Sequence, residues 1–153
     1  MPLKNGLQLM LDTYSEDFLA RDVEACVAFF DEDCRFITPR GVLQGRLQVE
    51  KLHNLWLQEG RVEREMAVQH VEALGPHLYA IWRFRDLMVD PATGQSDVQQ
   101  GTALGVIRLD PDDGWLIMAC STNFDAEQAF PPAAAPTRTT AGSSASRTAE
   151  TLA

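Results

Sequence analysis

Tyr14 is the residue whose type and position best suit it to act on a bound molecule. It falls in a segment where apolar residues recur at three- and four-residue steps, which is typical of an amphipathic helix. A phenol at such a position can donate a hydrogen bond to a carbonyl oxygen or an oxyanion. It can also pack its ring in a core and send its hydroxyl to water. Both interpretations remain open, because no neighbour in the sequence completes a proton-transfer pair.

Two arginines, Arg83 and Arg85, alternate with Trp82 and Phe84 in the segment I-W-R-F-R-D. Alternation places both guanidinium groups on one face of a strand, and we expect that face to be the concave one. Buried guanidinium groups require an anion, which would be a protein carboxylate or a ligand carboxylate. The alternative is an exposed strand end, or ion pairs with nearby acids. These acids are Asp86, Glu63 and Glu65.

Polar residues near the end of the folded segment supply further candidates for ligand contacts. Ser121 and Asn123 alternate in C-S-T-N-F, so they share one face of a strand. Pointing inward they would orient a ligand, and pointing outward they would belong to a fraying strand end. Trp56 lies on the apolar stripe of a predicted helix, where we expect it to line a cavity.

Histidines and cysteines give no sign of a metal site or a covalent mechanism. The three histidines, His53, His70 and His77, share no metal-ligand spacing, and we expect structural or exposed roles for them. The three cysteines, Cys26, Cys34 and Cys120, form no paired spacing and leave an odd count. Reduced, buried thiols in a cytoplasmic protein fit this pattern. No glycine-rich phosphate loop is recognisable, and we expect no cofactor.

The composition limits the class of partner. With 153 residues and 45% hydrophobic residues, the chain suits one globular domain and an appendage. A net charge of -9 argues against nucleic-acid binding, which relies on clustered Lys and Arg. No apolar stretch approaches the length of about 20 residues that spans a bilayer, so we expect no membrane partner.

The elements that must position these residues follow from periodicity, caps and turns. The pattern of residues 1–130 predicts one domain. The composition of residues 131–153, rich in Pro, Ala, Ser and Thr, predicts a disordered tail. Helices are expected over residues 4–20 and over Arg46–Glu59. A further helix is expected after the N-cap Asp22, and its apolar face would carry Val23, Cys26, Val27 and Phe30. Strands are expected at Cys34–Thr38, Val62–Leu74, Leu78–Val89, Val98–Leu109 and Trp115–Phe124. This order predicts an α+β fold with three N-terminal helices packed on a curved antiparallel sheet.

The long strands are apolar on both alternations, although an antiparallel sheet normally has one solvated face. We therefore expect a homodimer, formed through the sheet face that carries Trp82 and Phe84.

Two stretches carry a resemblance to a known family. They are L-A-R-D-V-E-A-C-V-A-F-F-D-E-D-C-R-F-I-T-P with G-V-L-Q-G-R, and D-D-G-W-L-I-M-A-C-S-T-N-F near the end of the domain. Over about residues 5–125 the chain resembles the NTF2-like superfamily, in its SnoaL-like and ketosteroid-isomerase-like branch. The resemblance implies a cone-shaped α+β (cystatin-like) fold around a hydrophobic pocket, and it is nearly silent on chemistry.

The isomerase branch implies a carboxylate base, a second acid and a tyrosine, and only the tyrosine is matched, by Tyr14. The base position falls on Thr38, which cannot abstract a proton from carbon at neutral pH without strong activation. The second acid falls near Gly105. The resemblance therefore excludes that isomerase mechanism and leaves Thr38 as a candidate ligand contact. Hydratases of the superfamily pair Asp with His, which would here be His70 with Asp12 or Asp17.

Two functions follow. The first is a small-molecule pocket protein that binds a small apolar or carbonyl-containing ligand without the isomerase acids. The alternative is a cofactor-independent enzyme of the cyclase, isomerase or hydratase type, with Tyr14 as oxyanion donor.

Overall fold

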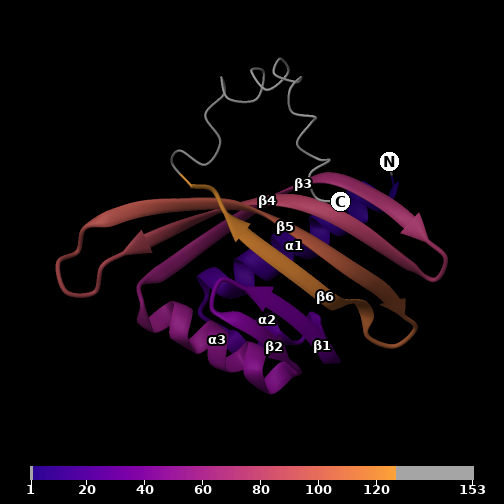
Figure 1. Ribbon diagram of the computed structural model, residues 1–153, viewed down its shortest axis with the longest axis horizontal. Coiled ribbons are helices and arrows are strands. Elements are labelled where there is room, and N and C mark those ends of the chain that lie inside the picture. Colours follow the sequence, from indigo (N-terminus) through magenta and orange to yellow (C-terminus); the bar gives the residue numbers. More distant parts are fainter. Residues whose placement is uncertain (1, 127–153) are drawn as a thin grey trace, which may run out of the picture.

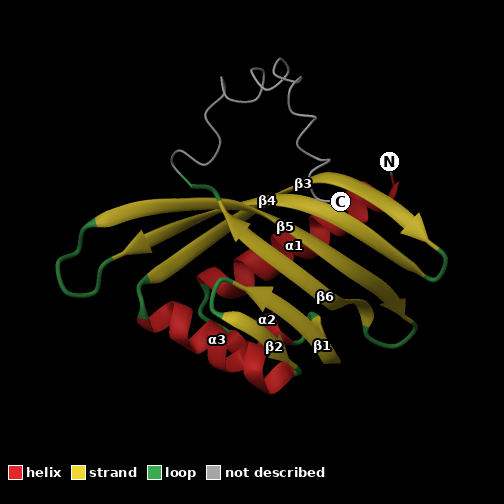
Figure 2. Cartoon of the chain, viewed as in Figure 1, coloured by secondary structure: helices red, strands yellow, loops and turns green. Residues whose placement is uncertain are grey.

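The computed structural model describes residues 2–126, which fold into helices that lie along one face of a single curved sheet (Figures 1 and 2). The predicted tail at residues 131–153 lies outside the described residues. The helices are α1 (Pro2–Leu19), α2 (Val23–Val27) and α3 (Arg46–Gln58). The strands are β1 (Phe30–Thr38), β2 (Gly41–Gln44), β3 (Arg61–Leu74), β4 (His77–Val89), β5 (Ser96–Asp110) and β6 (Gly114–Phe124).

The sheet has the strand order β2-β1-β6-β5-β4-β3, and it is mixed rather than wholly antiparallel. The strands β3 to β6 form an antiparallel meander, and β1 and β2 form a hairpin. Strand β1 pairs with β6 in parallel, with Phe36 opposite Cys120. The expectation of an antiparallel sheet therefore fails at this junction. Hairpin connections force antiparallel pairing, whereas β1 and β6 are connected through β2, α3 and the strands β3 to β5.

Helix α1 forms where the sequence predicts it, because Leu7, Leu11, Tyr14 and Phe18 recur along one side and are all buried. It ends before Arg21, whose φ of 63° breaks the helical path. Helix α2 is shorter than expected. Asp22 caps it by accepting a hydrogen bond from the Ala25 backbone nitrogen at 3.0 Å. Phe30, expected on the apolar face of that helix, instead begins β1.

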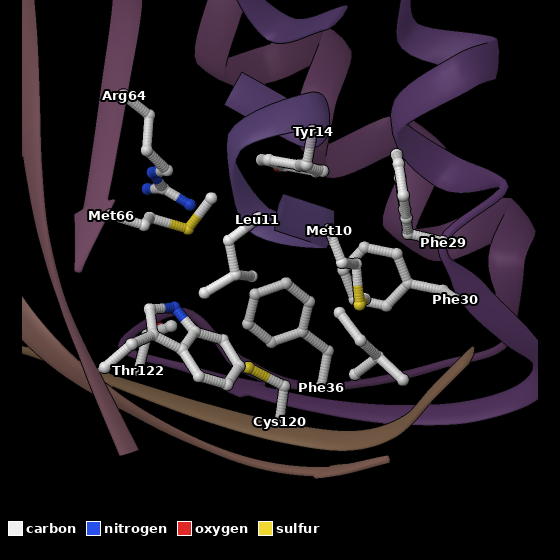
Figure 3. A pocket seen from close by; sticks show the side chains of 12 residues that line it. Met10, Leu11, Tyr14, Phe29, Phe30, Phe36, Arg64, Met66, Cys120 and Thr122 are labelled. Atoms are coloured by element: carbon white, nitrogen blue, oxygen red, sulfur yellow. The ribbon is translucent and has the colours of Figure 1, made fainter. Parts of the chain in front are cut away.

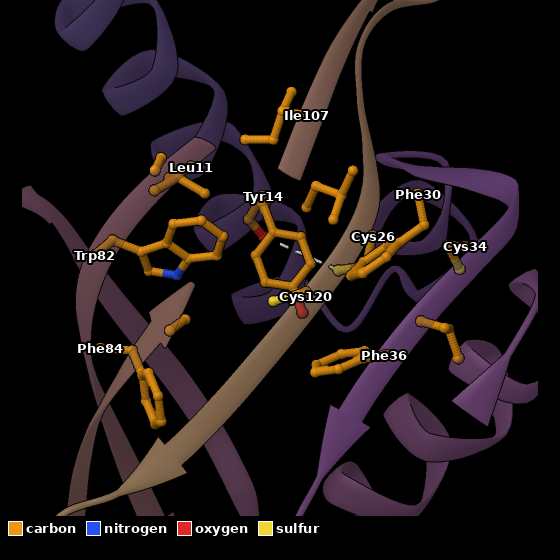
Figure 4. Close-up of a cluster of buried hydrophobic side chains, with 14 of the residues drawn as sticks. Leu11, Tyr14, Cys26, Phe30, Cys34, Phe36, Trp82, Phe84, Ile107 and Cys120 are labelled. Atoms are coloured by element: carbon orange, nitrogen blue, oxygen red, sulfur yellow. Dashed lines mark hydrogen bonds between the residues drawn. The ribbon is translucent and has the colours of Figure 1, made fainter. Parts of the chain in front are cut away.

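The inner face of β4 is the one that carries Trp82 and Phe84, which are 4% and 2% exposed. Figure 4 shows both rings among the buried side chains of the core. Arg83 and Arg85 therefore point to the outer face, so the expected assignment of this strand's faces was wrong. Alternation fixes which residues share a face but not which face meets the helices. The apolar face predicted to join two subunits is the core of a single protomer.

Two glycines on β5 make room for these rings. A Cβ built on Gly105 would lie 2.7 Å from the indole of Trp82, and one on Gly101 would lie 2.5 Å from the ring of Phe84. The missing side chains do not widen the interior. They are filled by aromatic rings from β4, which holds the sheet wall close-packed.

Candidate ligand-binding site

An inner cavity of about 30 Å³ lies between α1 and the concave face of the sheet (Figure 3). In Figure 3 the side chains of Leu11 and Tyr14 from α1 and of Arg64 from β3 surround the same space. The walls are mainly apolar, and the lining residues are Met10, Leu11, Tyr14, Phe29, Phe30, Phe36, Arg64, Met66, Trp82, Ile117, Cys120 and Thr122. Apart from Arg64, this cavity offers few polar groups.

Tyr14 and His53 form a buried pair beside the inner cavity. His53 is 0% exposed, and its Nδ1 lies 2.8 Å from the carbonyl oxygen of Val49, to which it must donate. Its Nε2 is therefore the acceptor, and the Tyr14 hydroxyl donates to it at 2.5 Å. Burial lowers the pKa of His53 to about 4, and burial raises the pKa of Tyr14 above its usual range. The proton therefore stays on the phenol and is directed at Nε2 of His53.

A larger outer cavity of about 430 Å³ opens between the end of β1, helix α3 and the strands. Its lining residues are Thr38, Pro39, Arg40, Leu52, Trp56, Glu59, Arg61, Arg64, Met88, Gln99, Thr122 and Phe124. Arg64 and Thr122 line both cavities, so the inner cavity adjoins the outer one at these residues. The volume falls within the range of about 300–1,000 Å³ for small-molecule sites.

Two buried arginines, Arg61 and Arg64, form the charged floor of the outer cavity and share the carboxylate of the fully buried Asp86. We call these three residues the arginine cluster. Arg64 donates through Nε and Nη2 to the two carboxylate oxygens of Asp86, each at 2.6 Å. Arg61 donates through Nη1 to the same carboxylate at 2.6 Å. Both guanidinium groups also stack on Trp56, at 5.1 and 4.7 Å from its ring centroid.

The protonation of the arginine cluster follows from these contacts. Burial would lower the pKa of Arg64, but the hydrogen bonds and charge of Asp86 more than offset it, so the pKa is raised. For Arg61 the balance is reversed: burial lowers its pKa and the charge of Asp86 only partly compensates. Asp86 therefore offsets the cost of burying the positive charge less fully for Arg61 than for Arg64.

Of the candidate ligand contacts, Thr38 and Trp56 line the outer cavity. The hydroxyl of Thr38 donates to the carbonyl of Gly41 and accepts from the Arg40 backbone nitrogen, both at 3.1 Å. Its hydrogen bonds therefore hold the hairpin turn together. Whether Thr38 and Trp56 contact a ligand stays a prediction.

The other candidates lie on the outer face of the sheet. Ser121 pairs with Leu104, which is 47% exposed, and Asn123 pairs with Thr102. Arg83 donates to Asp125 at 2.6 Å and Arg85 lies 3.5 Å from Glu65. These positions correct the expectation that Arg83 and Arg85 face the cavity, and of the two directions left open for Ser121 and Asn123 they show the outward one. The inward residues of C-S-T-N-F are Cys120, Thr122 and Phe124, which alternate with Ser121 and Asn123.

The suggested Asp–His pair is not formed. The side chain of His70 is half exposed and contacts Glu72 and Tyr79, each at 3.2 Å. Asp12 instead accepts a hydrogen bond from Gln8. Within residues 2–126, no group of three His, Cys, Asp or Glu side chains could hold a metal ion. None of the described helices is long and apolar enough to cross a membrane.

The three cysteines are free and buried. Burial raises the pKa of both Cys26 and Cys120 to about 12, and it raises the pKa of Cys34 as well. A thiol must ionise before it acts as a nucleophile, so these groups are packing residues at neutral pH.

The arginine cluster was not predicted from the sequence, for a geometric reason. Arg61 and Arg64 are three residues apart, which in a regular strand would place them on opposite faces. A register shift between Arg61 and Glu63 inserts one extra residue and turns both inward. Asp86 did carry a signal, because it continues the alternation of Trp82 and Phe84 and so shares their inner face.

No family model and no curated protein matches the chain. Solved structures match it at low identity. An NTF2-like superfamily protein from Salmonella enterica serovar Typhimurium LT2 superposes with a TM-score of 0.71 at 18% identity, over 85% of this chain and 96% of that one. ActVI-ORFA from Streptomyces coelicolor gives 0.66 at 15% identity, over 82% and 98%. A ketosteroid isomerase-like protein from Erwinia carotovora atroseptica gives 0.65 at 15% identity, over 74% and 88%.

At these identities the matches establish a shared fold but do not establish a shared chemistry. Helices on one face of a curved, unclosed sheet are common to this chain and the matched structures over most of their lengths. The resemblance inferred from the sequence is confirmed at this level: the protein has the NTF2-like fold.

Proposed function

We propose that the protein is a small-molecule pocket protein, and that its cavities bind a compact apolar ligand carrying a carbonyl group. The observation that carries this proposal is the outer cavity of about 430 Å³, where apolar walls meet a few convergent polar groups. Leu52, Trp56 and Phe124 supply apolar surface, and Arg61 and Arg64 supply hydrogen-bond donors for a carbonyl oxygen.

Binding without turnover is the better-supported form of this function. General acid–base catalysis needs a positioned base within reach of the ligand. Of the acids at the outer cavity, Glu59 accepts from Arg40 at 2.5 Å and Asp86 accepts three hydrogen bonds from two arginines. The Tyr14 hydroxyl already donates its hydrogen bond to His53. This engagement of each group weighs against the alternative of an enzyme with Tyr14 as oxyanion donor.

A cytoplasmic location is part of the proposal, supported by the three free, buried thiols, which are typical of a reducing compartment.

A titration with 2-acetonaphthone, a flat apolar ketone, tests this function through the quenching of tryptophan fluorescence, because Trp56 lines the outer cavity. We expect saturable binding. Thr122→Leu, which enlarges a buried side chain where the two cavities adjoin, should weaken it at least about tenfold by occupying ligand space.

Ser121→Leu is the matched control, because it makes a similar change one residue away on the outer face. It should leave the affinity unchanged. Binding that is absent, or that is equally sensitive to both substitutions, would refute a ligand site at these cavities.

A further inference from the structure

The outer cavity has an excess of positive charge in an acidic protein. The whole chain carries a net charge of -9. At the cavity rim Arg40 and Glu59 neutralise each other in an ion pair. On the floor, Arg61 and Arg64 share the single carboxylate of Asp86, which leaves one positive charge. The local charge is therefore opposite in sign to that of the chain.

This charge is held where water cannot stabilise it well. Arg61 and Arg64 are 4% and 5% exposed, and Asp86 is fully buried. A buried charge is costly unless it is paired and hydrogen-bonded. The aromatic rings of Trp56 and Phe84 lie over Arg64 at 4.7 and 4.8 Å, which compensates only in part.

Arg61 also has unused hydrogen-bonding capacity. Its Nε is buried and has no partner within the described residues. Its Nη2 reaches Gln99 Oε1 only at 3.3 Å, whereas the bond from Nη1 to Asp86 is 2.6 Å. A guanidinium group has five N–H donors, and only one of those on Arg61 makes a short bond to a carboxylate. The residue lines the outer cavity, so a ligand there can approach it.

From this geometry we infer that the ligand is an organic monocarboxylate with a compact aromatic or branched apolar body, whose carboxylate is bound by Arg61 on the floor of the outer cavity. This inference rests on the proposed small-molecule function and narrows its ligand class. One carboxylate would neutralise the one excess positive charge and give Arg61 a charge-assisted, fork-shaped partner. The body would lie against Trp56, Leu52 and Phe124.

The test compares two probes of the same shape, 2-naphthoate and 2-acetonaphthone, by isothermal titration calorimetry on the full chain. The carboxylate should bind at least about tenfold more tightly, because hydrogen bonds to charged groups are stronger than neutral ones. Inorganic phosphate, which lacks an apolar body, should not compete with 2-naphthoate at millimolar concentration. Competition by phosphate would identify a general anion site and overturn the inference.

Arg61→Gln should remove the preference, so that both probes bind within about twofold of each other, while Arg64 and Asp86 remain a neutral pair. Arg85→Gln is the matched control, since it removes the same charge from the exposed outer face and should keep the preference. Arg61→Lys should recover only part of it, because an ammonium keeps the charge but loses the fork.

The outcomes separate the two proposals. If the ketone binds and the wild-type protein shows no preference for the carboxylate, the small-molecule function stands and the carboxylate inference fails. If neither probe binds, the small-molecule function itself fails. The comparison of probes on the wild-type protein decides this even where Arg61→Gln does not fold.

Discussion

The hydroxyl of Tyr14 donates a hydrogen bond of 2.5 Å to Nε2 of His53, which is 39 residues away in the sequence. Both side chains are buried, and they join α1 to α3 beside the inner cavity. The tautomer of His53 is set by the carbonyl of Val49, one helical turn earlier. This pair gives the Tyr14 hydroxyl a buried protein partner, where the sequence left open water or a ligand oxygen. A ligand contact by Tyr14 stays a prediction.

Tyr14→Phe should lower the free energy of unfolding by about 1–3 kcal/mol, because it leaves the buried Nε2 of His53 without its donor. Affinity for 2-acetonaphthone should change by less than about twofold, since the lost proton faces His53. Chemical denaturation and the fluorescence titration measure the two quantities on the same sample. Weakened binding at unchanged stability would instead place the hydroxyl on the ligand.

His53 should make the protein less stable as the pH falls below about 6.5. Burial lowers its folded pKa from 6.5 to about 4, so its contribution is fully present above pH 6.5 and is lost towards pH 4. The stability lost over this pH range is about 3 kcal/mol. Melting temperatures between pH 7 and pH 4 should therefore fall less steeply in His53→Gln than in the wild-type protein. His70→Gln, at an exposed histidine, serves as the control. If the melting temperature of His53→Gln fell with pH as steeply as that of the wild-type protein, the pH dependence could not be assigned to His53.

Gly105→Ala should destabilise the fold by about 1–3 kcal/mol through overpacking against the indole of Trp82. The backbone there is ordinary strand, so the cost lies in the contact and not in the φ angle. A double-mutant cycle with Trp82→Leu should recover most of the loss, because the ring that causes the clash is removed. Additive effects of the two substitutions would show that Gly105 serves another purpose.

We propose a homodimer through the outer face of the sheet, with a second copy of the chain as the occupant. Leu104 and Ile37 are 47% and 49% exposed there, and no described helix covers this face. Light scattering should give twice the chain mass of 17.0 kDa. Leu104→Glu should give the monomer, and the same substitution at Leu47, a more exposed leucine on α3, should not. A monomeric wild-type protein would defeat the proposal.

Local pattern in the sequence was sufficient for the order of the helices and long strands, though not for β2, and for the inner sides of α1 and α3. The period of α1 identified Leu7, Leu11, Tyr14 and Phe18 as one face, and all four are buried. A helix has one apolar stripe, so its pattern states which side meets the core. Trp56 was placed at the cavity for the same reason.

The faces of the strands and the composition of the site were decided by the tertiary structure. Both alternations of β4 are rich in large side chains, so the pattern could not tell which one meets the helices. Parallel pairing of β1 with β6 depends on a contact between distant parts of the chain. The register shift in β3 that turns Arg61 and Arg64 to one side is a feature of pairing with β4. Period-two alternation fixes neighbours on a strand, whereas pairing and packing fix the direction in which they point.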